Sequence, residues 1–148
     1  MKRSEALAML SRDHHQALVV AQKLTRADAD TATTARTRFL DFWNSEGRRH
    51  FQLEEELLLP AYAAYGDAHH PLVLQVLGDH VAIRAHVAQL NARPDTTTDV
   101  LREFGTMFAA HVRLEERELF PIIEDAIPAD ELLQLARELE RAEHEDAN

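Results

Sequence analysis

Two copies of one motif hold the residues of this chain that could carry chemistry. His50 and Glu54 stand four positions apart. His111 and Glu115 repeat that spacing sixty-one positions later, and the same leucine, second glutamate and proline follow in each copy. Residues four apart share one face of an α-helix. One such pair is common on a solvated helix, but two matched copies indicate two halves of one metal site, because imidazole and carboxylate are ligands for transition metals.

Two further histidines fall in the apolar stripes of predicted helices. His14 lies in the stripe of a helix over 4–25, and His80 lies in that of a helix over 71–92. An aspartate precedes each of them, so the first two helices resemble the next two as an internal repeat. In an antiparallel bundle, inward side chains from facing helices converge in the core. The candidate metal ligands are therefore His14, His50, Glu54, His80, His111 and Glu115.

The four imidazoles and two carboxylates suit iron, manganese or zinc, because calcium and magnesium prefer oxygen ligands throughout. Two divalent ions would bring more positive charge than two glutamates balance, and a bridging hydroxide or oxide could offset the excess. Open coordination positions would remain for a small ligand, which is the condition for reactivity. A purely structural bundle without metal fits poorly, since each unpaired buried charge costs on the order of several kcal/mol.

The hydrophobic spacing predicts an all-α protein built around these ligands. Apolar residues recur at steps of three and four in five segments, 4–25, 31–65, 71–92, 97–126 and 130–143. Pro60 should kink or loosen the second helix, because proline lacks an N–H donor. The fifth helix is short and is expected to pack on the outside of the bundle through Leu132, Leu133, Leu135 and Leu139. With 148 residues and no flexible linker, the chain is expected to form a single domain, 1–148.

The composition excludes several classes of protein and site. There is no cysteine, so disulfides, thiolate zinc sites and iron–sulfur clusters are excluded. The net charge of −10, with scattered lysines and arginines, argues against nucleic-acid and membrane partners. The N-terminus lacks the apolar core of a signal peptide and no apolar run approaches a membrane span, so we expect a cytoplasmic protein. The sequence identifies no protein partner.

The order of the six candidate ligands, together with the two Glu-Glu and proline tails, resembles the hemerythrin-like HHE cation-binding family over nearly the whole chain. The resemblance implies an up-down-up-down antiparallel four-helix bundle around a non-haem di-iron centre with two iron ions. It also implies that the protein binds or senses oxygen or another small diatomic ligand. The alternative is a di-iron oxidoreductase acting on oxygen, peroxide or nitric oxide, so whether the chain is an enzyme stays open at this point.

Two positions depart from the oxygen-carrying hemerythrins. Those proteins have a second histidine one turn after the third-helix ligand, where this chain has Arg84. They also have an aspartate one residue beyond the position of Glu115, where this chain has Glu116. Both departures argue against reversible oxygen carriage.

Other polar residues near the motifs are weaker candidates. Glu46 lies one turn before His50 and could be an extra ligand, whereas His15 and His86 lie off the stripes. The adjacent histidines 69 and 70 stand in a polar turn before a proline and are expected to be solvated. Ferritin-like di-iron proteins use Glu-x-x-His, and no glutamate here has a histidine three residues later.

Overall fold

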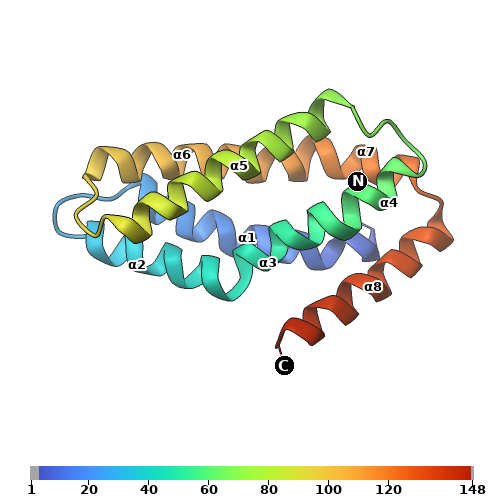
Figure 1. The fold of residues 1–148 in the computed structure, drawn as a ribbon, viewed down its shortest axis with the longest axis horizontal. Helices are drawn as coiled ribbons and strands as arrows, with labels where there is room; N and C mark the ends of the chain where they lie inside the picture. The colour runs from blue at the N-terminus through green and yellow to red at the C-terminus, as the bar shows by residue number, and fades with distance from the viewer. Residues whose placement is uncertain (1–3, 148) are drawn as a thin grey trace.

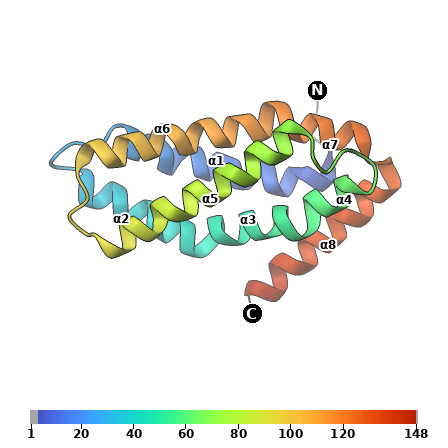
Figure 2. The same cartoon turned by 45° about the horizontal axis from the view of Figure 1, so that its top comes forward.

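The computed structural model describes residues 4–147, and within that range every regular element is helical (Figure 1). Long helical stretches lie side by side as a bundle, and the last helix packs obliquely across one end (Figures 1 and 2). The predicted all-α bundle is therefore confirmed. The α-helices are α1 (Glu5–Thr25), α2 (Ala32–Phe42), α3 (Arg48–Leu53), α4 (Leu59–Ala63), α5 (Pro71–Ala92), α6 (Thr98–Leu114), α7 (Phe120–Ala126) and α8 (Ala129–Ala147).

Three π-helical segments join some of these helices into longer stretches. The segments are η1 (Trp43–Gly47), η2 (Glu54–Leu58) and η3 (Glu115–Leu119), so that α2 continues to α4 and α6 continues to α7. The segments η2 and η3 each begin at the glutamate of a His-x-x-x-Glu motif and end two residues before Pro60 and Pro121. Proline cannot supply the N–H of an α-helical hydrogen bond, and the wider turn before it takes up the disturbance. The loosening predicted at Pro60 has this form.

Two apolar clusters fill the bundle on either side of a polar layer. The cluster toward α2 contains Phe39, whose ring meets those of Phe104 and Phe108 edge to face. The other cluster lies toward α8 and is built mainly from leucine and isoleucine, including Leu7, Leu10, Leu58, Leu119, Ile123, Leu135 and Leu139. Along α1, His14 stands between Leu10 of one cluster and Ala17 of the other. The polar layer therefore has apolar packing on both sides, which limits its access to water.

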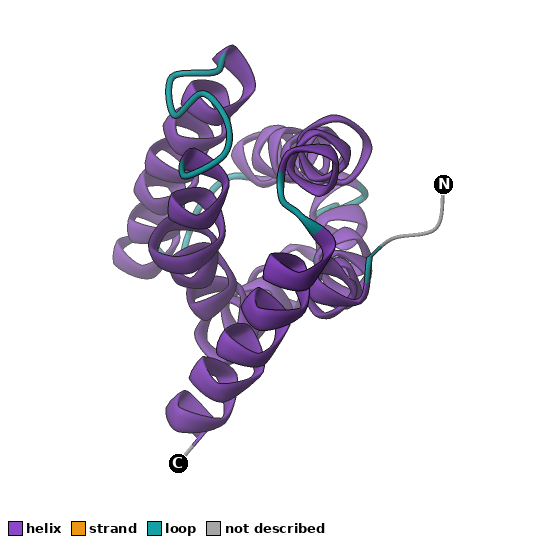
Figure 3. Ribbon diagram, turned by 90° about the vertical axis from the view of Figure 1, so that its right-hand side faces the viewer, coloured by secondary structure: helices purple, strands orange, loops and turns teal. Residues whose placement is uncertain are grey.

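The helix predicted over 130–143 is α8, and it contacts α1, α3 and η2 from outside (Figure 3). Leu135 and Leu139 are buried in this contact, whereas Leu133 is 47% exposed. The prediction that Leu133 packs on the bundle is therefore wrong. Leu133 lies two residues before the buried Leu135, and a step of two residues turns a side chain to nearly the opposite side of an α-helix. None of the helices in residues 4–147 has the length and apolar character that a membrane span needs. Residues 1–3, which contributed to the expected location, lie outside the described residues.

The helices α1 and α6 approach each other closely at Gly105. A Cβ atom at this position would lie 2.7 Å from the backbone nitrogen of Thr25 and 2.8 Å from the carbonyl oxygen of Ala21. Backbone atoms cannot move aside as a flexible side chain can. Glycine at 105 therefore fixes the distance between the two helices that carry His14 and His111.

We expect Gly105→Ala to lower the free energy of unfolding by about 1–3 kcal/mol, the usual cost of an overpacked interface. Gly78→Ala is the matched control, because a Cβ atom there meets nothing within 4 Å. Alanine has the higher helix propensity, so the control should be neutral or more stable by up to about 1 kcal/mol. Urea unfolding of dilute protein measures both. A Gly105→Ala protein as stable as the parent would contradict the close approach.

Candidate metal centre

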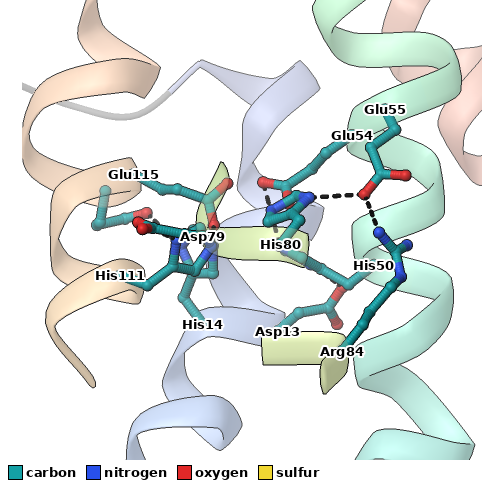
Figure 4. A network of polar contacts seen from close by, with 11 residues as sticks. Asp13, His14, His50, Glu54, Glu55, Asp79, His80, Arg84, His111 and Glu115 are labelled. Carbon is teal, nitrogen blue, oxygen red and sulfur yellow. Dashed lines mark hydrogen bonds and ion pairs between the residues drawn. The ribbon is translucent and has the colours of Figure 1, made fainter. Parts of the chain in front are cut away.

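All six predicted ligands meet in one buried layer between the apolar clusters (Figure 4). They come from four helical stretches, which are α1, the stretch from α3 into η2, α5, and the stretch from α6 into η3. Each is at most 4% exposed to solvent: His14, His50, Glu54, His80, His111 and Glu115. The internal repeat thus brings residues from distant parts of the chain to one place.

Each histidine of the layer has a carboxylate beside its outer ring nitrogen. The Nδ1 atoms lie 3.0 Å from Glu116 for His14, 3.0 Å from Asp13 for His50, 2.7 Å from Glu55 for His80 and 3.0 Å from Asp79 for His111. A carboxylate only accepts hydrogen bonds, so in the neutral imidazole Nδ1 carries the proton and donates it. The Nε2 atom then presents its lone pair to the layer, as in the carboxylate–histidine–metal arrangement.

These hydrogen bonds follow the internal repeat. Asp13 and Asp79 precede the first-helix histidines and accept from the motif histidine of their own half. Glu55 and Glu116 follow the motif glutamates and accept from the first-helix histidine of the opposite half. Sequence reasoning did not identify the role of these four carboxylates, although their recurrence at equal offsets was a signal that could have found them.

Eight buried polar atoms of the layer have no hydrogen-bond partner. They are the four Nε2 atoms and the four oxygens of Glu54 and Glu115, and no other buried side-chain nitrogen or oxygen within residues 4–147 is in this state. A buried polar atom without a partner costs about 1–3 kcal/mol. The concentration of eight such atoms in one layer indicates that a group outside the polypeptide satisfies them. Lone pairs of imidazole and carboxylate suit a cation, so the residues fit a metal.

The potential ligand atoms form two groups that share one residue. One group is His14, His50, Glu54 and Glu115, and the other is His80, His111 and Glu115, with the ligand atoms of each group within 4.8 Å of one another. Both glutamates contact a histidine from each half. The distances from Glu54 are 3.3 Å to His50 and 3.4 Å to His80, and those from Glu115 are 2.8 Å to His111 and 3.6 Å to His14. Each of the two groups could therefore hold a metal ion.

A small cavity adjoins the first of these groups. The centre of a water-sized molecule could occupy a volume of about 10 Å³ in this cavity. This volume is close to the minimum for a single water. Its polar border is made by His14, His50, Glu115 and Asp13, and its apolar lining by Ala17, Phe42, Gly47, Phe51, Phe108 and Val112. The cavity is therefore at the lower limit of size for one small molecule beside two imidazoles and a carboxylate.

The weaker candidates from the sequence do not reach the layer. Glu46 lines a surface groove. The π-helical turn η1 contains more residues per turn than an α-helix, so a spacing of four positions does not bring Glu46 onto the face of His50. His15 lines another surface groove, and His86 stacks on Phe104 at 5.0 Å. None of these three belongs to a potential ligand group of the described residues.

The two histidines of the turn before α5 also lie away from the layer. His69 is exposed, as expected. His70 is half-buried, and its Nδ1 accepts a hydrogen bond from the backbone N–H of Leu72, so it caps the start of α5.

Arg84 and Glu116, the two residues that differ from the oxygen carriers, form hydrogen bonds at the edge of the layer. Arg84 donates to Glu55 at 2.6 Å, and the same carboxylate oxygen accepts from His80. The guanidinium carbon of Arg84 also lies 5.6 Å from the ring centre of Phe51, which stacks on His80. Glu116 binds the outer nitrogen of His14. Neither residue directs its side chain at the central lone pairs.

The carboxylates determine the charge of the layer when no metal is bound. Burial by itself lowers the pKa of His111, but contact with Glu115 and the negative charge of Glu54 outweigh it and raise the pKa to about 9. Burial also lowers the pKa of His50, but the negative charge of Glu54 and the hydrogen bond to Asp13 outweigh it. The pKa of His50 therefore lies well above its usual value of 6.5. Protons on the imidazoles then supply positive charge beside the glutamates.

We expect the metal-free protein to lose stability as the pH rises from about 6.5 to about 9. Because the folded-state pKa of His111 is raised, its contribution is complete below the unfolded value of 6.5 and disappears as pH passes about 9. The effect at His111 is on the order of 3 kcal/mol. Thermal unfolding after treatment with a chelator measures it across this range. His111→Gln should flatten the dependence and the exposed His15→Gln should not; a melting temperature that rises with pH would contradict the assignment.

Comparison with known proteins agrees with the geometry. The family model described as the hemerythrin HHE cation binding domain matches residues 5–123. No curated protein and no solved structure matches the chain. The matched range contains the helical stretches that carry all six residues of the layer and ends before α8. The chain therefore belongs to the hemerythrin HHE cation-binding domain family, as the motifs indicated, and is a metal-binding domain.

Proposed function

We propose that the buried layer holds two iron ions as a non-haem di-iron centre, in an up-down-up-down antiparallel four-helix bundle, and that the protein binds or senses oxygen or another small diatomic ligand there. The observation that carries this proposal is the set of eight buried nitrogen and oxygen atoms without partners. A mixed set of imidazoles and carboxylates favours iron, manganese or zinc over calcium or magnesium. Among these metals, iron agrees best with the family resemblance.

We assign a separate pair of histidines to each ion. His14 and His50 would hold one ion, and His80 and His111 the other. Glu54 and Glu115 would serve both, which their contacts to histidines of both halves support. The carboxylates at the four Nδ1 atoms would fix the orientation of each ring and increase its basicity as a ligand.

The cavity beside His14 and His50 supports a diatomic ligand. Its volume suits one small molecule, and its lining of alanine, phenylalanine and valine favours an uncharged molecule over an ion. When bound, the ions would supply Lewis acidity and one-electron redox chemistry. Phe42, Phe108 and Val112 would exclude water from the ligand, and the rings of His14 and His50 would lie beside it.

The two departures from oxygen carriers support sensing over reversible carriage. Arg84 donates to the same carboxylate oxygen of Glu55 that orients His80. Because arginine stands where the carriers have histidine, this position offers no imidazole to a second ion. A metal held by His80 and His111 would therefore have one protein ligand fewer than the oxygen carriers supply. The net charge of −10 supports a small-molecule partner instead of nucleic acid or an anionic membrane.

We expect purified protein reconstituted anaerobically with ferrous iron to contain about two metal ions per chain. His111→Ala and Glu54→Ala should lose metal and lower the melting temperature of the loaded form, because metal binding is coupled to folding. Asp79→Asn should retain the ligands but weaken metal affinity by about 10–100-fold. Elemental analysis and metal titration measure these effects.

The matched control for the metal titration is His69→Ala, an exposed histidine outside the layer. It should change neither metal content nor melting temperature. Loss of metal from His69→Ala with retention in His111→Ala would reverse our ligand assignment. One ion per chain in the parent protein would reduce the proposal to a mononuclear site, and none would reject it.

We expect the ferrous protein to oxidise on mixing with oxygen and not to recover its ferrous spectrum when oxygen is removed. Stopped-flow absorption followed by evacuation measures this. Recovery of the ferrous spectrum would support the carrier function instead. Sustained consumption of oxygen or peroxide with a reductant would support the oxidoreductase, whereas one stoichiometric oxidation supports a sensor. Arg84→His should move the response toward reversibility.

A further inference from the structure

The outer side of α5 is unusually apolar for a surface of this protein. Leu74, Leu77 and Val81 are 53%, 37% and 69% exposed, and they are half of the six large hydrophobic residues found exposed among the described residues. Charged residues make up 28% of the chain, yet every exposed residue of α5 is uncharged. Figures 1 and 2 show α5 on the near side of the bundle with no described helix over it. A helix that is apolar on both sides is normally buried on both sides.

The exposed residues of α5 repeat with the spacing of a helix–helix seam. Steps of four and three alternate through Leu74, Gly78, Val81, Ala85, Ala88 and Ala92, all of them exposed. We call these six residues the α5 outer face. This is the heptad spacing with which one helix packs its side chains between those of another. The inward residues of α5 follow a separate stripe that contains His80 and Ile83.

The sizes of the side chains on the α5 outer face match a second copy in the opposite direction. Antiparallel pairing centred between residues 81 and 85 places Val81 against Ala85 of the partner, Gly78 against Ala88, and Leu74 against Ala92. Each contact occurs twice in a two-fold interface. Each bulky side chain thus meets a small one, the condition for interdigitated packing. A parallel pair would instead set leucine against leucine and alanine against alanine, with uneven spacing.

The charges near the α5 outer face are compatible with a second copy. Two chains that each carry a net charge of −10 repel one another, and a neutral face lets them meet with the least opposition. Charged residues beside a helical seam select partners and orientation. Here the flanking positions are Gln75, Leu77, Ala82, Arg84, Gln89 and Asn91, and Arg84, the charged residue among them, is hydrogen-bonded to Glu55 of its own chain. The flanking charge of Arg84 is already paired within the chain, and the neutral α5 outer face fits itself.

We propose that two copies of this chain associate through the α5 outer face, with the two α5 helices antiparallel. The association needs no metal, so it stands independently of the proposed di-iron centre. It buries the exposed leucines and valine of both copies. Because the opposite side of α5 carries His80 and Asp79, the association also sets the two metal layers of the dimer on either side of one helix pair.

Sedimentation velocity of the full chain over a wide range of concentration tests the association. We expect a dimer that dissociates on dilution. Val81→Glu places a charge opposite Ala85 of the partner and should abolish the dimer. The matched control is Leu133→Glu on α8, where the parent side chain is 47% exposed and the dimer should persist. Circular dichroism checks that both variants keep their helix content, as the exposure of the two positions predicts.

The direction of the two helices is tested by cross-linking, which the absence of native cysteine makes specific. A mixture of Leu74→Cys and Ala92→Cys chains should form mixed disulfides under mild oxidation, since facing positions reach the required separation of about 4–7 Å between Cα atoms. Leu74→Cys alone should not cross-link. Efficient cross-linking of Leu74→Cys alone would reject the antiparallel arrangement. A protein that is monomeric at every concentration, or a dimer that Val81→Glu leaves intact, would reject the interface.

Discussion

Eight lone-pair-bearing atoms in the middle of the bundle have no hydrogen-bond partner in the polypeptide while the imidazoles are neutral, and the surrounding structure is arranged around that deficit. Each atom has lost its hydration and gained no hydrogen bond, so the layer is costly to bury unless positive charge enters it. In the absence of a metal, protons supply that charge, which is why the pKa of His111 rises to about 9. The apolar clusters on both sides keep water out and hold the atoms close together.

The orientation of the rings depends on groups at the edge of the layer. Each imidazole is held at one nitrogen by a carboxylate. Two of the rings also stack on aromatic side chains, with ring centres 3.8 Å apart for Phe51 and His80 and 5.1 Å apart for Phe120 and His14. A ring fixed at one nitrogen and one face has little freedom at the other nitrogen. The geometry of the layer is therefore set before any ion arrives.

Repetition and helical periodicity were enough to predict the all-helical bundle and the residues that would meet in its core. They could not predict which carboxylate reaches which ring, because periodicity gives the face of a helix and not its neighbour; Glu55 and Glu116 cross to the opposite half. Glu46 was misplaced because α-helical spacing does not hold through the π-helical segment η1. The cavity was also beyond reach, since it depends on Gly47 and Phe108 packing from different helices.

The crossed hydrogen bonds have a consequence for how such a site can arise. Neither helical hairpin can complete its half of the layer alone, because Glu55 serves His80 and Glu116 serves His14. Two identical copies of one hairpin, related by a two-fold axis, would make the same set of contacts by symmetry. A chain that joins the two copies is free to let them differ. Gly47 in the first half and Phe108 at the corresponding position of the second are such a difference, and both line the cavity beside His14 and His50.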